Sequence, residues 1–368
     1  MKHHSIVFTG GGTGGHVFPG IAVAEKLLLD TDNSEINITW IGSNSGMEKE
    51  ILNRYQVSFI SIPSGKLRRY FSIHNFIDIF KIIGGVFASL YVLKKIKADL
   101  LFSKGGFVTV PPVLAAKILK IPVISHESDL DPGLATRING RFSQKMLFAY
   151  EETLKKWNKK FPDQELIVTG NPVRKEIFEG SRTRGRALYN IPKDRKVILV
   201  LGGSQGAREV NLLIEEILGN LLDSYFVIHQ MGELLYKEST KHNYITRTLF
   251  EEDFPDILAI SDLIISRAGA GTLWENGVCG KPAILIPLGA GSSRGDQIRN
   301  ADYFESHGAA IVLKGENLNS SRLFLEINKL LGTESNLKEL EKNVKLLCNT
   351  NSVETIVKII TQDIGFTR

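Results

Sequence analysis

The stretch that decides the fold is residues 5–24, SIVFTGGGTGGHVFPGIAVA. It begins with an apolar run of strand length and ends in a helical pattern. Between them, residues 10–16 hold five glycines, a threonine and a histidine. A tight turn needs far fewer glycines, so we infer that another molecule approaches this backbone closely. Such loops receive phosphate groups on their amides and on the N-terminus of the following helix.

Strand-length apolar runs alternate with helical patterns along nearly the whole chain, which is typical of α/β proteins with parallel sheets. The predicted strands are SIVFT, ITWIG, VSFISI, DLLFS, IPVISH, KMLFA and LIVTG in the first half, and KVILVLG, FVIHQ, YITRTL, DLIIS, PAILIPL and AAIVL in the second. We therefore predict an α/β fold with two doubly wound, Rossmann-like domains that face each other across a cleft.

The predicted boundary between the domains lies near VTGNPVRKEIF, residues 168–178, where glycine, asparagine and proline interrupt the pattern. We expect an N-terminal domain over 1–172 and a C-terminal domain over 173–352. A C-terminal helix of about 353–368 is expected to pack back on the first domain.

Composition is that of a soluble globular protein, with 43% hydrophobic and 23% charged residues. The two cysteines form no CxxC motif or Cys/His cluster, which predicts a reducing cytoplasm and no structural zinc. The N-terminus shows no signal peptide. The pair of aspartates at 129 and 131 lies in a predicted loop of the first domain and is not placed for a metal, so we expect no metal ion and no cofactor.

Three more glycine loops follow predicted strands and lead into helices. They are SKGGFVTVPPVLAA at 103–116, GGSQGAREVN at 202–211 and SRAGAGTLWENGVCGKP at 266–282. One such loop is a common α/β turn, but four of them spread over both halves indicate phosphates on each side of the predicted cleft.

Four polar side chains near these loops suit sugar-transfer chemistry. His16 has a pKa range suited to proton transfer. Glu275 follows the fourth loop and can accept hydrogen bonds from both hydroxyls of a ribose. Gln297 and Asn300 lie three residues apart, on one face of a helix, and their amides suit sugar hydroxyls and an N-acetyl group.

Seven motifs, in family order, resemble the MurG-type UDP-N-acetylglucosamine–N-acetylmuramyl-(pentapeptide) pyrophosphoryl-undecaprenol N-acetylglucosaminyltransferases. They are GGTGGHVFPGIAVA, SKGGFVTVPPVLAA, PVISHESDLDPGLATRI, GNPVR, GGSQGAREVN, RAGAGTLWE and GDQIRNA. The resemblance implies a GT-B fold and an inverting enzyme of peptidoglycan synthesis. It also implies that the domain over 1–172 faces the acceptor and the membrane and that the domain over 173–352 binds the UDP-sugar. Its expected reaction moves N-acetylglucosamine from UDP-N-acetylglucosamine to the C4 hydroxyl of undecaprenyl-diphospho-N-acetylmuramoyl-pentapeptide, converting lipid I into lipid II.

The resemblance also implies roles for individual residues, with His16 as the catalytic position. Residues implied to bind UDP-N-acetylglucosamine are Thr13, Gly14, Gly15, Arg174, Ser204, Gln205, Gly206, Glu275, Gln297 and Asn300. Residues implied to hold the acceptor diphosphate are Gly11, Gly12, Gly105, Gly106, His126, Glu127 and Asp129. The chain departs from the family pattern at Asp129, where many members carry asparagine, and at Asp296, where some carry glutamine.

The segment 66–97 is basic and apolar, with seven Lys or Arg residues against one acidic residue. Its central run carries charges and leads directly into a predicted strand, so we interpret it as a helix packed on the sheet and not as a membrane span. Basic residues beside aromatic residues suit an anionic leaflet, and no nucleic-acid-binding motif accompanies them. We expect peripheral docking on the cytoplasmic side of the bacterial inner membrane through Lys66, Arg68, Arg69, Phe71, Phe76 and Phe80.

Two other enzymes remain as alternatives. A UDP-sugar 2-epimerase would share the architecture and the donor contacts, but it would consume the donor without an acceptor. A nicotinamide-dependent oxidoreductase is suggested by Gly10, Gly12 and Gly15, which satisfy G-x-G-x-x-G. The second strand ends in ITWIGSNSG, without the acidic residue that would bind the ribose of NAD. A non-catalytic nucleotide-sugar binder would not need the full set of motifs.

Overall fold

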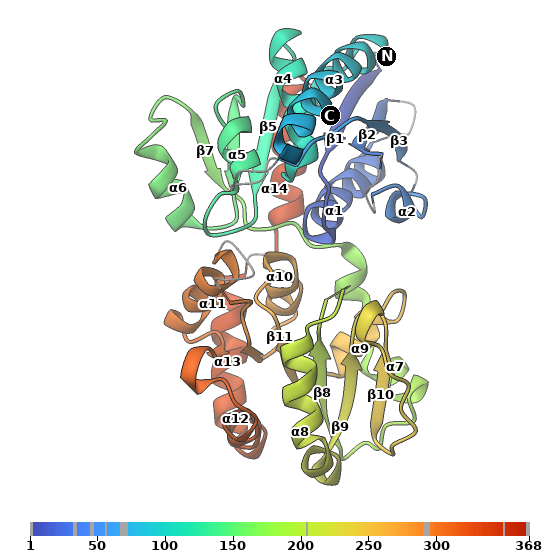
Figure 1. Ribbon diagram of the computed structural model, residues 1–368, viewed down its shortest axis with the longest axis vertical. Coiled ribbons are helices and arrows are strands. Elements are labelled where there is room, and N and C mark those ends of the chain that lie inside the picture. The colour runs from blue at the N-terminus through green and yellow to red at the C-terminus, as the bar shows by residue number, and fades with distance from the viewer. Residues whose placement is uncertain are drawn as a thin grey trace. The chain divides into compact units, whose positions relative to one another are not determined.

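The computed structural model describes residues 3–31, 35–44, 48–55, 57–66, 73–203, 205–289, 295–348 and 350–365. It divides into two compact units (Figure 1). Unit 1 consists of Met1–Arg174 and Thr350–Arg368, and unit 2 consists of Lys175–Asn349.

Unit 1 is built on a seven-stranded sheet in the order β3-β2-β1-β4-β5-β6-β7, with every neighbouring pair parallel. Its strands are β1 (His4–Thr9), β2 (Ile36–Ser43), β3 (Ser58–Ile62), β4 (Leu100–Ser103), β5 (Val123–Glu127), β6 (Lys145–Phe148) and β7 (Glu165–Val168). Its helices are α1 (Gly14–Asp30), α2 (Glu48–Leu52), α3 (Ile73–Lys95), α4 (Val110–Ile118), α5 (Leu134–Asn139), α6 (Glu151–Asn158) and α14 (Ser352–Asp363).

Both faces of this sheet are covered, because side chains alternate along each strand. On β1, Ile6 and Phe8 join a core with α1 and α14, whereas Val7 joins a core with α3 and α4. Figure 1 shows α14 in red beside α1, and the two helices are in contact. The C-terminal helix therefore completes the core of the first unit.

The helix α3 packs its inner face on the sheet and on α4. A Cβ placed on Gly85 would lie 2.2 Å from the carbonyl oxygen of Pro63 and 3.0 Å from Cγ of Pro111. Gly85 therefore allows close approach between α3 and its neighbours. Among the described residues, no helix is long and apolar enough to cross a membrane.

Unit 2 repeats the design with a six-stranded sheet in the order β10-β9-β8-β11-β12-β13, again parallel throughout. Its strands are β8 (Lys196–Leu201), β9 (Tyr225–Gln230), β10 (Tyr244–Arg247), β11 (Leu263–Ser266), β12 (Ala283–Leu285) and β13 (Ile311–Val312). Its helices are α7 (Arg182–Leu188), α8 (Arg208–Ser224), α9 (Phe254–Ile260), α10 (Ala270–Val278), α11 (Asp296–Ser306), α12 (Ser320–Gly332) and α13 (Glu334–Leu347). The predicted α/β class with two doubly wound parallel sheets is confirmed.

Candidate active site

The four glycine loops predicted from the sequence lie at the two points where the strand order reverses. In unit 1 the neighbouring strands β1 and β4 lead into a glycine loop at 10–13, which runs into the start of α1, and into the loop 104–106. In unit 2 the neighbours β8 and β11 lead into glycine loops whose described residues are 202–203 with 205–207, and 267–269. Open α/β sheets bind ligands beyond the carboxyl ends of their strands at such a switch point.

The two glycine loops of unit 1 touch each other. The Gly11 amide donates to the carbonyl oxygen of Gly105 at 3.4 Å, and a Cβ placed on Gly106 would lie 2.2 Å from the carbonyl oxygen of Gly11. Gly12, Gly105 and Gly106 all have positive φ, between 85° and 97°. Glycine is therefore required here both by backbone conformation and by space.

His16 lies in the first turn of α1 and faces the second glycine loop. Its amide donates to the carbonyl oxygen of Thr13 at 3.1 Å. A Cβ placed on Gly105 would lie 3.4 Å from Nδ1 of His16, and one placed on Gly106 would lie 3.2 Å from its Cδ2. The half-buried imidazole is thus held at the junction of the two loops, while Thr13 and Gly15 are exposed beside it.

Glu48 was not singled out from the sequence, yet it fixes the first loop. This fully buried carboxylate accepts a hydrogen bond from the Gly12 amide at 2.9 Å, and a Cβ on Gly11 would lie 1.7 Å from its Oε1. The Trp40 indole donates to the carbonyl oxygen of Gly10 at 3.1 Å. The Gly12 amide is thus engaged within the protein, and a bound phosphate would need other donors.

A buried polar chain runs beneath the second loop. Lys104 Nζ donates to Ser128 Oγ, and Ser128 Oγ donates to Asn171 Oδ1 at 2.7 Å. Burial lowers the pKa of Lys104 to about 8, although the charges of Glu127 and Asp129 act to raise it. An ammonium group therefore lies directly before Gly105.

The other predicted acceptor residues lie beside this chain. His126 is buried, and one ring nitrogen is 2.8 Å from the carbonyl oxygen of Gly170. Burial, followed by the charge of Lys104, holds the pKa of His126 well below its usual range, so the ring is neutral near pH 7. The buried Glu127 accepts the amides of Asp129 at 3.0 Å and Gly133 at 3.2 Å. His126 thus contacts the segment after β7, and Glu127 holds the segment that follows β5.

Arg174 ends the first of the two chain segments that form unit 1. Its guanidinium carbon lies 4.2 Å from the ring centroid of Phe18 on α1, in cation–π geometry. The structure therefore places Arg174 against the helix that carries His16. Ser204, also predicted for the donor, lies outside the described residues.

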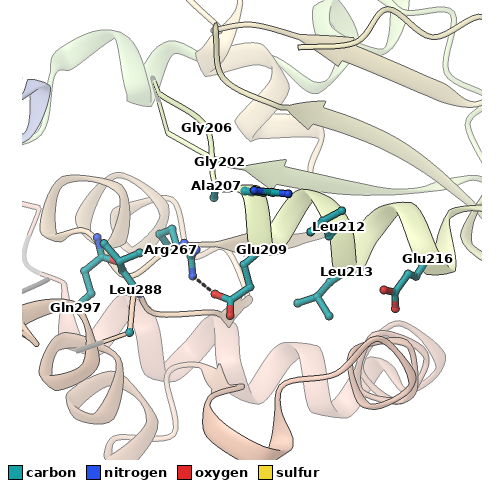
Figure 2. Close-up of a pocket in the computed structure, with 12 residues that line it drawn as sticks. Gly202, Gly206, Ala207, Glu209, Leu212, Leu213, Glu216, Arg267, Leu288 and Gln297 are labelled. Atoms are coloured by element: carbon teal, nitrogen blue, oxygen red, sulfur yellow. Dashed lines mark hydrogen bonds and ion pairs between the residues drawn. The ribbon is translucent and has the colours of Figure 1, made fainter. Parts of the chain in front are cut away.

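Unit 2 contains an open pocket of about 760 Å³ at its glycine loops (Figure 2). Of the predicted donor residues, Gly206 and Gln297 line it. Arg208, Glu209, Leu212, Leu213 and Glu216 of α8 extend along one side, and Arg267, Leu288 and Gly289 complete the lining with Gly202 and Ala207. The pocket joins the N-terminus of α8 to the loops after β11 and β12.

Arg267 is a basic side chain of this pocket that the sequence analysis missed. Its Nη1 lies 2.8 Å from a carboxylate oxygen of Glu209 and donates to the carbonyl oxygens of Ile286 at 3.0 Å and Pro287 at 3.3 Å. Figure 2 shows Arg267 and Glu209 pointing toward each other across the pocket. Its position directly after a strand, at the start of a glycine loop, was the available signal.

The remaining predicted donor residues are arranged around the fourth glycine loop. Gln297 accepts the Leu288 amide at 2.9 Å, so its side chain holds the loop after β12. Asn300 is buried and donates to the carbonyl oxygen of Ala268 at 3.3 Å. Glu275 is half-buried on α10. Gln297 and Asn300 thus position backbone at the pocket, and Gln297 also lines it.

A buried relay fixes the third glycine loop from behind. His229 bonds Tyr244 OH at 2.9 Å and Asn211 Oδ1 at 3.0 Å, and Asn211 Nδ2 donates to the Met231 carbonyl oxygen at 3.1 Å. That carbonyl oxygen would lie 2.4 Å from a Cβ on Gly206, whose φ is +87°. Burial lowers the pKa of His229 to about 4. The neutral His229 ring therefore joins β9 to β10 through Tyr244 and to α8 through Asn211.

Two family models match the chain. The glycosyltransferase family 28 N-terminal domain matches residues 6–148, and the glycosyltransferase family 28 C-terminal domain matches residues 197–359. The first match covers β1 to β6 and the glycine loops of unit 1, and the second covers the six strands and the glycine loops of unit 2.

A relative from Treponema denticola is 44% identical over 358 residues, covering 92% of this chain and 90% of the relative. It is named UDP-N-acetylglucosamine–N-acetylmuramyl-(pentapeptide) pyrophosphoryl-undecaprenol N-acetylglucosamine transferase. The crystal structure of Acinetobacter baumannii MurG matches with a TM-score of 0.73 and 25% identity, covering 98% of this chain and 99% of the other. A UDP-GlcNAc 2-epimerase from Neisseria meningitidis shares the fold, with a TM-score of 0.72 and 16% identity over 97% of this chain and 100% of the other.

Proposed function

The chain belongs to glycosyltransferase family 28, and from that membership we propose that it transfers N-acetylglucosamine from UDP-N-acetylglucosamine to undecaprenyl-diphospho-N-acetylmuramoyl-pentapeptide. This reaction converts lipid I into lipid II in peptidoglycan synthesis. The observation that carries the proposal is the position of the four glycine loops, two at the switch point of each unit. Donor and acceptor each carry a diphosphate, so two anion sites are needed.

The donor diphosphate is assigned to unit 2, whereas Thr13, Gly14 and Gly15, which the resemblance implies for the donor, lie in unit 1. The pocket lies at the N-terminus of α8, a helix of 17 residues, where backbone amides and the helix dipole favour a diphosphate. The guanidinium of Arg267 can exchange the Glu209 carboxylate for a phosphate, because a guanidinium donates paired hydrogen bonds to the oxygens of either anion. Glu275 would bind the ribose, and Gln297 and Asn300 would shape the N-acetylglucosamine site.

The acceptor is assigned to the glycine loops of unit 1. His16 lies where these two loops meet, so an acceptor diphosphate on the loops would bring its sugar close to the imidazole. We assign His16 as the general base that takes the proton from the C4 hydroxyl of the muramyl sugar. Attack on the opposite face from the leaving diphosphate inverts the anomeric carbon and gives a β-1,4 link.

The negative charge that develops on the leaving UDP is stabilised by groups already in place in unit 2. The N-terminus of α8 and the side chain of Arg267 border the same pocket. Fixed dipoles and charges of this kind are worth more in a closed site than in water, because they need no reorganisation during the reaction.

The outer face of α3 supports docking to the membrane that holds the acceptor. Its exposed apolar side chains recur at helical spacing and are Ile79, Phe80, Ile83, Phe87 and Tyr91. Exposed Lys94 and Lys95 follow at the end of the helix, and Lys95 Nζ lies 5.8 Å from the ring centroid of Tyr91. Such a surface suits the anionic cytoplasmic leaflet of the inner membrane.

Among the predicted membrane residues, Phe80 lies on this face and Lys66 is exposed. Arg68, Arg69 and Phe71 lie outside the described residues, as does the side chain of Phe76.

The activity is tested by supplying UDP-N-acetylglucosamine with and without a lipid I analogue. We expect disaccharide product and UDP only when the acceptor is present, and a large loss of kcat in His16→Ala. Conversion of the donor to its C2 epimer without acceptor would identify an epimerase instead. Near-normal turnover by His16→Ala would remove this residue from the chemistry.

A further inference from the structure

Lys104 joins β4 to the Gly105–Gly106 loop, and its side chain is only 1% exposed. Its Nζ donates to Ser128 Oγ, which in turn donates to Asn171 Oδ1. A buried ammonium is costly unless it is hydrogen-bonded and near opposite charge. Its position beneath a glycine loop therefore calls for an explanation beyond packing.

The charges that face Lys104 come from β5 and the loop that follows it. Glu127 and Asp129 are the two acidic neighbours that act on its charge, and His126 is a neutral neighbour. From the first glycine loop the nearest residue is Gly10, where a Cβ would lie 3.1 Å from the Lys104 Cβ. With Lys104 protonated, the cluster carries one net negative charge; without that proton it carries two.

We propose that Lys104 is a positioning residue whose buried ammonium offsets Glu127 and Asp129, so that the Gly105–Gly106 loop can accept an anionic ligand. The ligand is the diphosphate of the acceptor, so this inference rests on the proposed function. Asp129 adds a negative charge near the loop, and the Lys104 ammonium opposes it. Without that ammonium, a diphosphate at the loop would meet a more negative surrounding.

The protonation of Lys104 gives the inference a pH dependence. The pKa of Lys104 is about 8, so the ammonium is present at pH 7 and mostly lost at pH 9. Acceptor affinity should therefore fall as the pH rises through 8. At an effective dielectric constant of about 20, losing one unit charge near the ligand corresponds to a change of about tenfold or more in the acceptor KM.

The test compares steady-state kinetics of the full chain with a lipid I analogue at pH 7 and pH 9. Lys104→Met should raise the acceptor KM about tenfold at pH 7, remove its increase with pH, and leave the donor KM unchanged. Asp129→Asn added to Lys104→Met restores the net charge and should return the acceptor KM close to the wild-type value. Lys117→Met, an exposed lysine on α4, is the matched control for loss of one positive charge.

The compensating variant separates charge from structure. A lysine that acted only in packing would not be rescued by Asp129→Asn, and thermal unfolding of each variant shows whether the unit is folded. If Lys104→Met and the double variant have the same acceptor KM, or if the wild-type acceptor KM does not change between pH 7 and 9, the inference is wrong. If wild-type protein makes no disaccharide at all, the proposed function fails instead.

Discussion

Replacing Phe80, Phe87 and Tyr91 with serine should release the protein from anionic membranes. These rings are 70%, 68% and 67% exposed on one face of α3. An aromatic side chain offers roughly 200 Å² of surface, so about 140 Å² of each ring is available for burial. At about 25 cal/mol per Å², full burial contributes about 3.5 kcal/mol per ring. Half immersion of all three rings then contributes about 5 kcal/mol, or between about three and four orders of magnitude in the partition coefficient.

The assay is sedimentation with vesicles of phosphatidylglycerol and phosphatidylethanolamine, followed by turnover of a soluble acceptor analogue. We expect the triple variant to lose vesicle binding and to keep its activity on the soluble analogue. Leu325→Ser with Leu346→Ser is the matched control, because these leucines are exposed in unit 2. Vesicle binding by the triple variant within a few-fold of wild type would refute the assignment of this face.

Three further predictions follow from contacts in the two units. Glu48→Ala removes the acceptor of the Gly12 amide and should destabilise unit 1 by about 2–4 kcal/mol in urea unfolding. Glu48→Gln keeps an acceptor oxygen and should cost about 1 kcal/mol or less. Equal stability of the two variants would contradict this. Arg267→Gln should raise the donor KM about tenfold or more and leave the acceptor KM unchanged, and an effect on the acceptor alone would exclude a role at the donor diphosphate. The pKa of His229 is about 4 in the folded protein and 6.5 in the unfolded chain. As the pH drops from 6.5 to 4, the unfolded chain therefore takes up a proton that the folded protein does not. The free energy of unfolding should fall by up to about 3 kcal/mol over this range. His229→Gln should show a shallower fall over that window, and an identical slope would rule out His229 as the source.

The strands and glycine loops were predictable from the sequence because they depend on local patterns. Each apolar run became a strand, and the loop at 10–15 lies where its glycines indicated. The switch points could not be read directly, since they depend on which strands pair. Only the order β2-β1-β4 shows that the loops after β1 and β4 are neighbours.

The supporting side chains could not be predicted, because their partners are distant in the sequence. Glu48 is an acidic residue in the first turn of a helix, where a favourable interaction with the dipole is the ordinary explanation. Its contact with Gly12 joins residues 36 positions apart. Lys104 and His229 likewise sit in apolar strands or at their ends, with nothing local to mark the networks they join.

Hydrogen exchange of the backbone amides, measured with each ligand separately, tests the central claim most directly. That claim assigns the nucleotide sugar to the glycine loops of unit 2 and the acceptor diphosphate to those of unit 1. UDP-N-acetylglucosamine should slow exchange in peptides covering 202–208 and 266–271, and the lipid I analogue should slow it in peptides covering 10–16 and 104–107. Protection of the unit 1 loops by UDP, with no change in unit 2, would contradict the assignment.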